Sequence, residues 1–119
     1  MKRLLGVSLV AFCLSVSIAA QSESQKVSGH LVDGVCASNH AAEPGYAANH
    51  ERECNLMDGC IKSGYSVITA EQRVFKFDQT GNEQALALIK ATDKNKDFKV
   101  VVTGKVDGGT IAVKSIAVQ

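Results

Sequence analysis

The stretch NEQALALIKAT, residues 82–92, predicts the helix on which the fold assignment depends. Asn82 is a suitable N-cap residue, and Glu83 places an acidic side chain in the first turn, where the helix dipole favours negative charge. The apolar side chains that follow recur at helical spacing, and they are Ala85, Leu86, Leu88 and Ile89. We expect this helix to end near Thr92.

Runs of strand-forming residues lie on both sides of this helix. Their alternation of apolar and polar side chains, bounded by turn residues, predicts five strands, at residues 26–33, 65–70, 74–78, 98–106 and 110–118. The sequence Asp107-Gly-Gly109 is typical of a tight hairpin between the last two. In the final strand the predicted inward positions are Ile111, Val113, Ile116 and Val118.

The segment 34–64 differs from the rest because it is rich in Ala, Asn, His and Cys and shows little strand alternation. Residues 46–62 within it could be helical, with Gly64 as the C-terminal stop. A helix between the third and fourth of five strands is the arrangement of an OB-fold barrel. We therefore predict a mostly β domain over residues 26–119, a five-stranded OB-like barrel with one or two helices and a Cys/His-rich insertion after the first strand. An open antiparallel sheet is the alternative.

The first residues predict export. Residues 1–20 combine a basic start, an apolar stretch at 4–14 and small residues before the expected cleavage point, as secretory signals do. The apolar stretch is too short to span a bilayer, and we assign Cys13 to the removed signal. Residues 21–25 are a polar linker. The expected product is periplasmic or secreted and has no stable membrane anchor.

Composition excludes some partners. The whole chain has 13 basic and 12 acidic side chains, and removal of the expected signal takes away two of the basic ones. A nearly neutral domain lacks the basic footprint of a nucleic-acid-binding protein. Trp is absent and aromatic residues are few, which weakens the case for stacking against single strands.

The candidate functional residues are Cys36, His40, Cys54 and Cys60. Three thiols cannot all pair within one chain, so at least one must be free, bonded to a partner or bound to a metal. Three thiolates and one imidazole form a closed tetrahedral zinc site, and a softer set that includes Met57 suits cuprous copper. We therefore predict an exported domain, without enzymatic activity, that binds zinc or copper as its cofactor through these four residues.

Two other histidines carry less weight. His50 precedes Cys54 by four residues, which is helical spacing for a shared ion, and this spacing is its only recommendation as a ligand. His30 lies in the first predicted strand and is expected to be a surface residue.

Two alternatives remain open. Export favours disulfides, so Cys36 could pair with either later cysteine, and Cys54 could pair with Cys60 if the chain bends between them. The stapled domain would then be an envelope interaction module that binds a protein or glycan partner. The second alternative is a thiol enzyme with Cys36 as nucleophile and His40 as its base.

The chain resembles a group of small exported bacterial proteins of uncharacterised function. The residues that carry the resemblance are Asp33-Gly-Val-Cys36 with His40, then Cys54 and Cys60-Ile-Lys-Ser-Gly64-Tyr, then Val101-Val-Thr-Gly104-Lys-Val-Asp-Gly108. The two later cysteines stand further apart here than is usual in that group. The resemblance implies export and a barrel-like fold, and it implies no activity.

Overall fold

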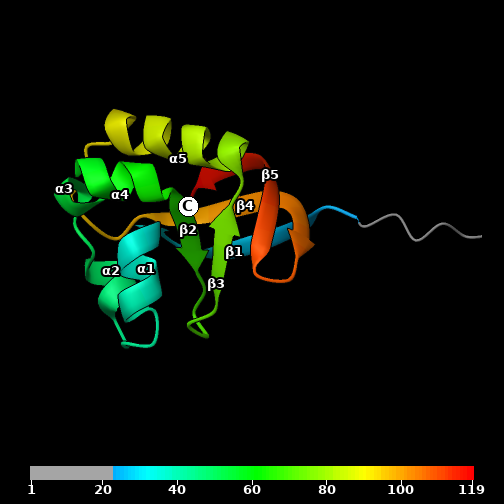
Figure 1. Ribbon diagram of the computed structural model, residues 1–119, viewed down its shortest axis with the longest axis horizontal. Coiled ribbons are helices and arrows are strands. Elements are labelled where there is room, and N and C mark those ends of the chain that lie inside the picture. Colours follow the sequence, from blue (N-terminus) through cyan, green and yellow to red (C-terminus); the bar gives the residue numbers. More distant parts are fainter. Residues whose placement is uncertain (1–22) are drawn as a thin grey trace, which may run out of the picture.

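The computed structural model describes residues 23–119 (Figure 1), so the expected signal peptide at 1–20 and Cys13 lie outside the described residues. The described chain holds five strands, β1 (Gln25–Asp33), β2 (Tyr65–Ile68), β3 (Val74–Phe77), β4 (Lys99–Asp107) and β5 (Thr110–Val118). It also holds five helices, α1 (Gly34–His40), α2 (Tyr46–Asn49), α3 (Arg52–Asn55), α4 (Asp58–Ser63) and α5 (Gln79–Ala91). None of these helices has the length and apolar character needed to span a bilayer.

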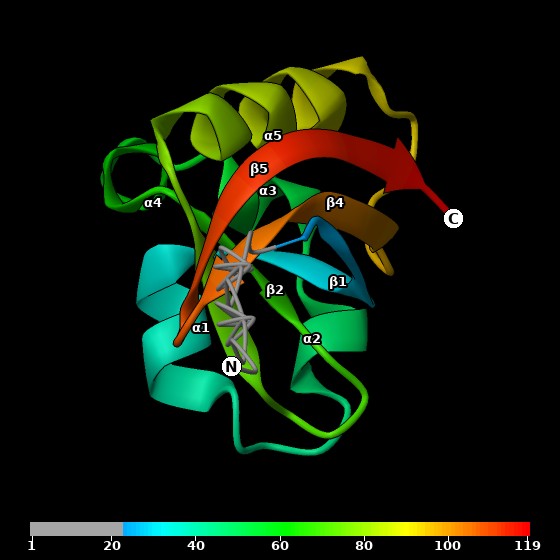
Figure 2. The same cartoon turned by 90° about the vertical axis from the view of Figure 1, so that its right-hand side faces the viewer.

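The strands form one sheet in the order β1-β2-β3-β5-β4, and the sheet closes into a ring because β1 also pairs with β4. The neighbouring strands are antiparallel except β3 and β5, which run parallel through the pairs Lys76–Thr110 and Phe77–Ile111. Figure 2 shows β5 curving beneath α5. The register between β4 and β5 shifts at Thr103 and Gly104. A side chain at Gly104 would place a Cβ 2.3 Å from the carbonyl oxygen of Ala112, so only glycine allows β5 this close.

The main core lies between the strands and α5. Its fully buried members are apolar and come from both, among them Leu31, Val67, Val100, Val102, Ile111, Ala85 and Ile89. Side chains alternate across a strand, so neighbours of these residues face outward. Val32 and Ile68 on that outer face pack with Ala37 of α1 in a second, smaller cluster. The insertion is therefore seated on the sheet by an apolar contact of its own.

The helix at the centre of the fold assignment is present but begins earlier than predicted. The prediction of Asn82 as its N-cap is wrong, because Asp78 caps α5 by accepting a hydrogen bond from the backbone N–H of Gly81 at 2.9 Å. The side chain of Asn82 instead accepts a hydrogen bond from the backbone N–H of Tyr65 at 2.8 Å. Asn82 is therefore used in a tertiary contact with β2, and Asp78, four residues earlier, caps the helix.

The insertion contains more helix than predicted. The segment expected to be irregular contains α1, and the helix predicted over 46–62 is divided into α2, α3 and α4. The divisions fall where His50 and Met57 adopt extended backbone, with ψ of 124° and 141°. The predicted stop at Gly64 is confirmed, with φ of 77° after α4. Figure 1 shows these four short helices together at one side of the sheet. The protein is thus mixed α/β, with more helix than the one or two predicted.

The predicted strands are confirmed to within a few residues, and the predicted linker at 21–25 is one residue too long because β1 begins at Gln25. The hairpin at Gly108-Gly109 is confirmed, with φ of 59° at Gly108. Ile111 and Val113 are buried as predicted, and Ile116 is half-buried against the core. The prediction that Val118 faces inward is wrong, because Val118 is 58% exposed.

Candidate metal centre

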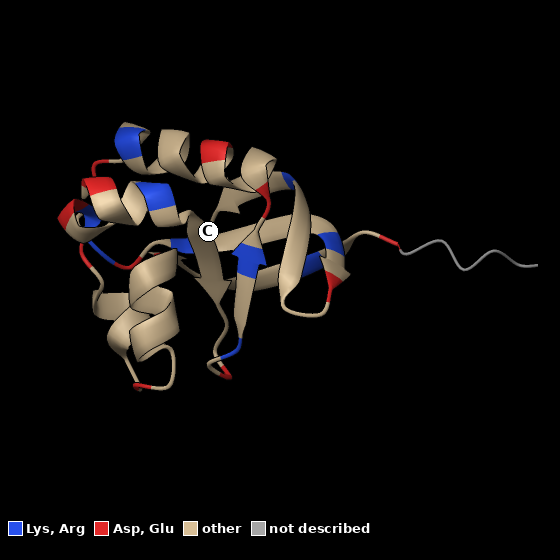
Figure 3. Ribbon diagram, viewed as in Figure 1, with Lys and Arg blue, Asp and Glu red and all other residues tan. Residues whose placement is uncertain are grey.

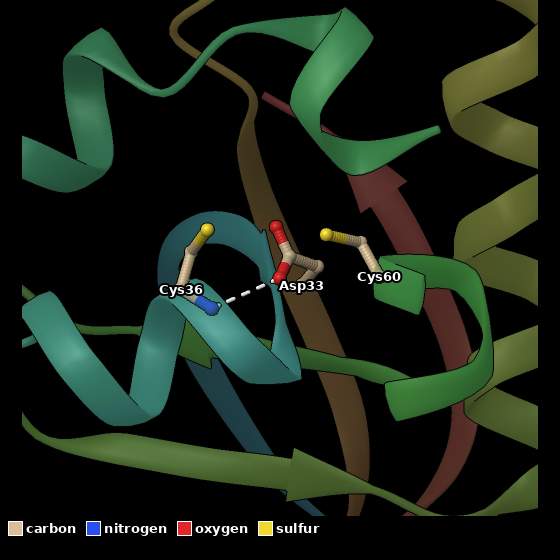
Figure 4. Close-up of side chains that lie close together, drawn as sticks. All are labelled: Asp33, Cys36 and Cys60. Atoms are coloured by element: carbon tan, nitrogen blue, oxygen red, sulfur yellow. Dashed lines mark hydrogen bonds between the residues drawn. The ribbon is translucent and has the colours of Figure 1, made fainter. Parts of the chain in front are cut away.

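Three candidate ligand atoms come together where β1 meets the insertion. Asp33 is the last residue of β1, Cys36 lies in the first turn of α1, and Cys60 lies on α4. A carboxylate oxygen of Asp33 and the two sulfur atoms all lie within 4.8 Å of one another. Figure 4 shows the sulfur atoms on opposite sides of the carboxylate, each directed toward it.

Backbone contacts hold α1 beside α4. The N–H of Gly34 donates to the carbonyl oxygen of Gly64 at 2.8 Å, which joins the start of α1 to the end of α4. A Cβ on Gly34 would lie 2.8 Å from the carbonyl oxygen of Ser63, so a larger residue there would push the helices apart. The hydroxyl of Ser63 donates back to the carbonyl oxygen of Cys60 at 2.6 Å. The separation of the two thiols is therefore set by fixed backbone.

Asp33 is fully buried and its carboxylate has two fixed partners. Oδ1 accepts a hydrogen bond from the backbone N–H of Cys36 at 2.9 Å, as an N-cap residue does. Oδ2 lies 2.8 Å from Nε2 of His50, which is itself buried. Burial alone would raise the pKa of Asp33, but the hydrogen bonds from His50 and from the backbone of Cys36 outweigh it and lower the pKa below its ordinary value. The carboxylate is thus held ionised inside the protein.

Asn55 lies on the other side of Asp33. Its Oδ1 accepts a hydrogen bond from the backbone N–H of Asp33 at 2.9 Å, and its carbonyl oxygen accepts one from the hydroxyl of Tyr65 at 2.6 Å. The residue is fully buried, yet its Nδ2 has no hydrogen-bond partner within the described residues. A buried donor without an acceptor costs free energy. The unpartnered Nδ2 therefore belongs to the same side-chain amide whose oxygen binds the backbone of the candidate ligand Asp33.

Both thiols of the group favour the protonated form. Burial and the negative charge of Asp33 raise the pKa of Cys36. The same causes raise the pKa of Cys60 to about 11. Burial also raises the pKa of Tyr65 to about 12, again with a contribution from Asp33. A nucleophilic cysteine needs a lowered pKa, so this environment disfavours thiolate chemistry unless a cation enters.

The four predicted ligands are only partly brought together. Cys36 and Cys60 belong to the group, whereas Cys54, half-buried on α3, lies outside it but close enough for its charge to raise the pKa of both. His40 is directed elsewhere, because its Nδ1 lies 2.9 Å from Oε1 of Glu43 and its ring stacks on Tyr46 with centroids 4.4 Å apart. No two of these three cysteines form a disulfide.

The predicted ligand set did not include Asp33, and it gave no role to His50 beyond its helical spacing to Cys54. Asp33 precedes Cys36 by three residues, which is the spacing of an N-cap and was the one signal available. His50 is the buried partner of that carboxylate and is not in the group of ligand atoms. His30 is 21% exposed at its side chain, and its Nε2 lies 2.7 Å from Oδ1 of Asp97, away from the thiols.

Comparisons with protein-family models, with curated proteins and with solved structures gave no match to this chain. The chemistry of the site therefore rests on its own residues.

Proposed function

We propose that this chain is an exported domain that binds one soft transition-metal ion, zinc or copper, between β1 and the insertion. Cys36, Cys60 and Asp33 supply the ligands, and Cys54 is the candidate for a fourth. The observation that carries the proposal is the convergence of three ligand atoms from three separate elements within 4.8 Å.

The distances suit such an ion. In a tetrahedral zinc site with Zn–S bonds of about 2.3 Å, neighbouring sulfurs lie roughly 3.8 Å apart. Separations of at most 4.8 Å therefore need only small side-chain rotations to reach that geometry. Each carboxylate oxygen of Asp33 has a second lone pair that its hydrogen bonds leave free. His50 would orient the carboxylate in the way that outer partners orient metal ligands.

Protonation also agrees with metal binding. Thiols whose pKa is raised stay protonated and unreactive without a cation, and a metal ion displaces their protons when it binds. The unpartnered Nδ2 of Asn55 offers a donor for a negatively charged ligand atom at the filled site. Asp33 thus takes the place that the sequence analysis gave to His40, whose ring is held by Glu43 and Tyr46.

The scaffold we propose is an OB-like barrel. Its support is the ring order β1-β2-β3-β5-β4, the parallel pairing of β3 with β5, and the helix α5 between β3 and β4. These features match the five-stranded, partly open Greek-key barrel of that class. Export remains a proposal that rests on residues 1–20 of the sequence.

A disulfide between Cys36 and Cys60 is the second candidate, because the same proximity favours it. Such a bond would staple α1 to α4 and leave Cys54 as a free thiol. The protein would then be an interaction module for an envelope protein or glycan. A disulfide and a metal ion exclude each other at these two sulfurs, so a single preparation distinguishes them.

Metal titration of the reduced, metal-free protein tests the proposal. We expect one equivalent of zinc to bind in competition with a chromophoric chelator, and cuprous ion to be tested in the same way. Cys36→Ser and Cys60→Ser should each weaken binding more than about tenfold, and Asp33→Asn by about ten- to a hundredfold. Cys54→Ser shows whether a fourth thiolate takes part.

His40→Ala is the matched control, since the structure directs His40 away from the thiols. It should leave the affinity unchanged while circular dichroism confirms that each variant is folded. Absence of stoichiometric binding, together with two oxidised cysteines in protein prepared from an oxidising compartment, would overturn the metal proposal in favour of the stapled module.

A further inference from the structure

A cavity of about 320 Å³ lies on the other side of α1 from the thiols. Its walls are α1, the end of α4 and the strands β2 and β3, and the residues that line it include Val35, Ser38, Ser63, Ser66, Lys76 and Phe77. With 3.6 residues per turn, Val35 and Ser38 lie about 60° apart around α1, whereas Cys36 lies about 100° from Val35 and about 160° from Ser38. The cavity is therefore separate from the candidate metal centre.

Ser66 is the unusual residue of this cavity. It is 1% exposed, and its hydroxyl has no hydrogen-bond partner within the described residues. In the β2–β3 ladder Ser66 pairs directly with Lys76. Directly paired residues project from the same face of a sheet, so the two side chains leave the sheet next to each other, and both line the cavity. A buried donor without an acceptor thus lies beside the side chain of a lysine.

The other serine hydroxyls of the wall are held by backbone carbonyl groups, and neither lies within hydrogen-bond distance of the Ser66 hydroxyl. Ser38 already donates to the carbonyl oxygen of Gly34 at 2.8 Å, and Ser63 donates to that of Cys60 at 2.6 Å. No residue that lines the cavity is acidic. The elements α1, β2 and β3 together contain one charged residue, Lys76, and Figure 3 shows no acidic residue on any of them. The fourth element, α4, carries Asp58 and Lys62, and neither of them lines the cavity. The cavity is locally cationic although the chain is nearly neutral.

We propose that this cavity binds the carboxylate of a small organic acid. One carboxylate oxygen would accept a charge-assisted hydrogen bond from Lys76, and the other would accept one from Ser66. The short apolar part of the ligand would lie against Val35, which is 45% exposed, and Phe77. A small acid and the C-terminus of a peptide share this chemistry. The inference is independent of metal binding.

Titration followed by amide NMR tests the inference, with butanoate as the probe and neutral butanamide as its matched control. Butanoate should produce saturable shifts at the amides of Gly34, Ser66 and Lys76, and butanamide should not. A short peptide with a free C-terminus, compared with its amidated form, shows whether a chain end binds too. Binding of the peptide alone assigns the site to chain termini, and binding of both probes assigns it to carboxylates in general.

Two variants and one control assign the contacts. Lys76→Gln should raise the Kd for butanoate about tenfold, whereas Lys105→Gln on β4 should leave it unchanged. Ser66→Ala should also raise the Kd, yet the thermal midpoint should stay the same or rise, because its buried hydroxyl has no partner to lose. Equal binding of butanoate and butanamide, absence of saturable shifts with any probe, or an unchanged Kd in Lys76→Gln would each overturn the inference.

Discussion

Asp33 connects the fold to the candidate site through a single side chain. It ends β1, caps α1 and forms a buried pair with His50. Its backbone N–H donates to Asn55. Asp33 is therefore contacted by α1, by α3 and by His50, which lies between α2 and α3. Replacing this carboxylate should therefore affect stability as well as metal binding.

Asp33→Asn should lower the free energy of unfolding by about 2–4 kcal/mol, because it removes the charge of a buried, hydrogen-bonded pair. Urea denaturation of the metal-free protein measures this loss. Asp97→Asn is the matched control, since Asp97 also pairs with a histidine, at 2.7 Å, but on the surface. Exposed pairs contribute little, so its unfolding midpoint should stay close to that of the original protein. Equal effects of the two substitutions would contradict the role given to Asp33.

The contribution of Asp33 should also depend on pH. Its pKa in the folded protein lies below the ordinary value of 3.8. A depressed carboxylate pKa stabilises the folded state above the unfolded pKa, and this stabilisation is lost as the pH falls through the folded value. The difference in unfolding free energy between the original protein and Asp33→Asn should therefore shrink below about pH 4. A difference that grows on acidification would show the opposite shift.

The thiol group shows the limit of reading residues from sequence. The sequence placed Cys36, Cys54 and Cys60 in one cysteine-rich insertion, but it did not show that only Cys36 and Cys60 come together with Asp33. The role of His50 was not predictable either, because it depends on the chain turning back over 17 residues to reach Asp33. His40 follows Cys36 by four residues, which is helical spacing for a shared ion, but its ring instead contacts Glu43 and stacks on Tyr46.

The β4–β5 hairpin and the end of α4 were predictable from the sequence, because each depends on a glycine that adopts a positive φ at that position. Gly64 ends α4 with φ of 77° and ψ of −168°, a backbone conformation that is almost confined to glycine. The N-cap of α5 was not predictable in the same way. Asp78 and Asn82 are both good caps, and only the contact between Asn82 and Tyr65 in the folded chain separates their roles.

Gly64→Ala should lower the free energy of unfolding by about 3 kcal/mol, because it forces an L-residue into this conformation. The added Cβ would also lie 2.7 Å from Nδ2 of Asn82. Gly108→Ala is the matched control, since Gly108 also has a positive φ but has no atom within 4 Å of an added Cβ. It should cost about 1 kcal/mol. Chemical denaturation of both variants tests the difference, and equal losses would exclude a role for the contact with Asn82.

At the size of the entire chain, the order of strands and the single long helix were predictable from alternation and turn residues. The four short helices of the insertion were not, because a helix of four to seven residues is stabilised by packing rather than by its own sequence. The insertion packs on the sheet through a small apolar cluster that includes Val32, Ala37 and Ile68. A metal ion held by Asp33, Cys36 and Cys60 would add a second connection between sheet and insertion.

The most direct test of this account is X-ray absorption spectroscopy of the protein loaded with one equivalent of zinc. The proposed metal centre should show at least two sulfur ligands at about 2.3 Å and an oxygen ligand at about 2.0–2.2 Å. This sulfur signal should fall by one ligand in Cys36→Ser and in Cys60→Ser and stay unchanged in His40→Ala. A first shell of nitrogen and oxygen alone, or a spectrum that loses its imidazole contribution in His40→Ala, would contradict it.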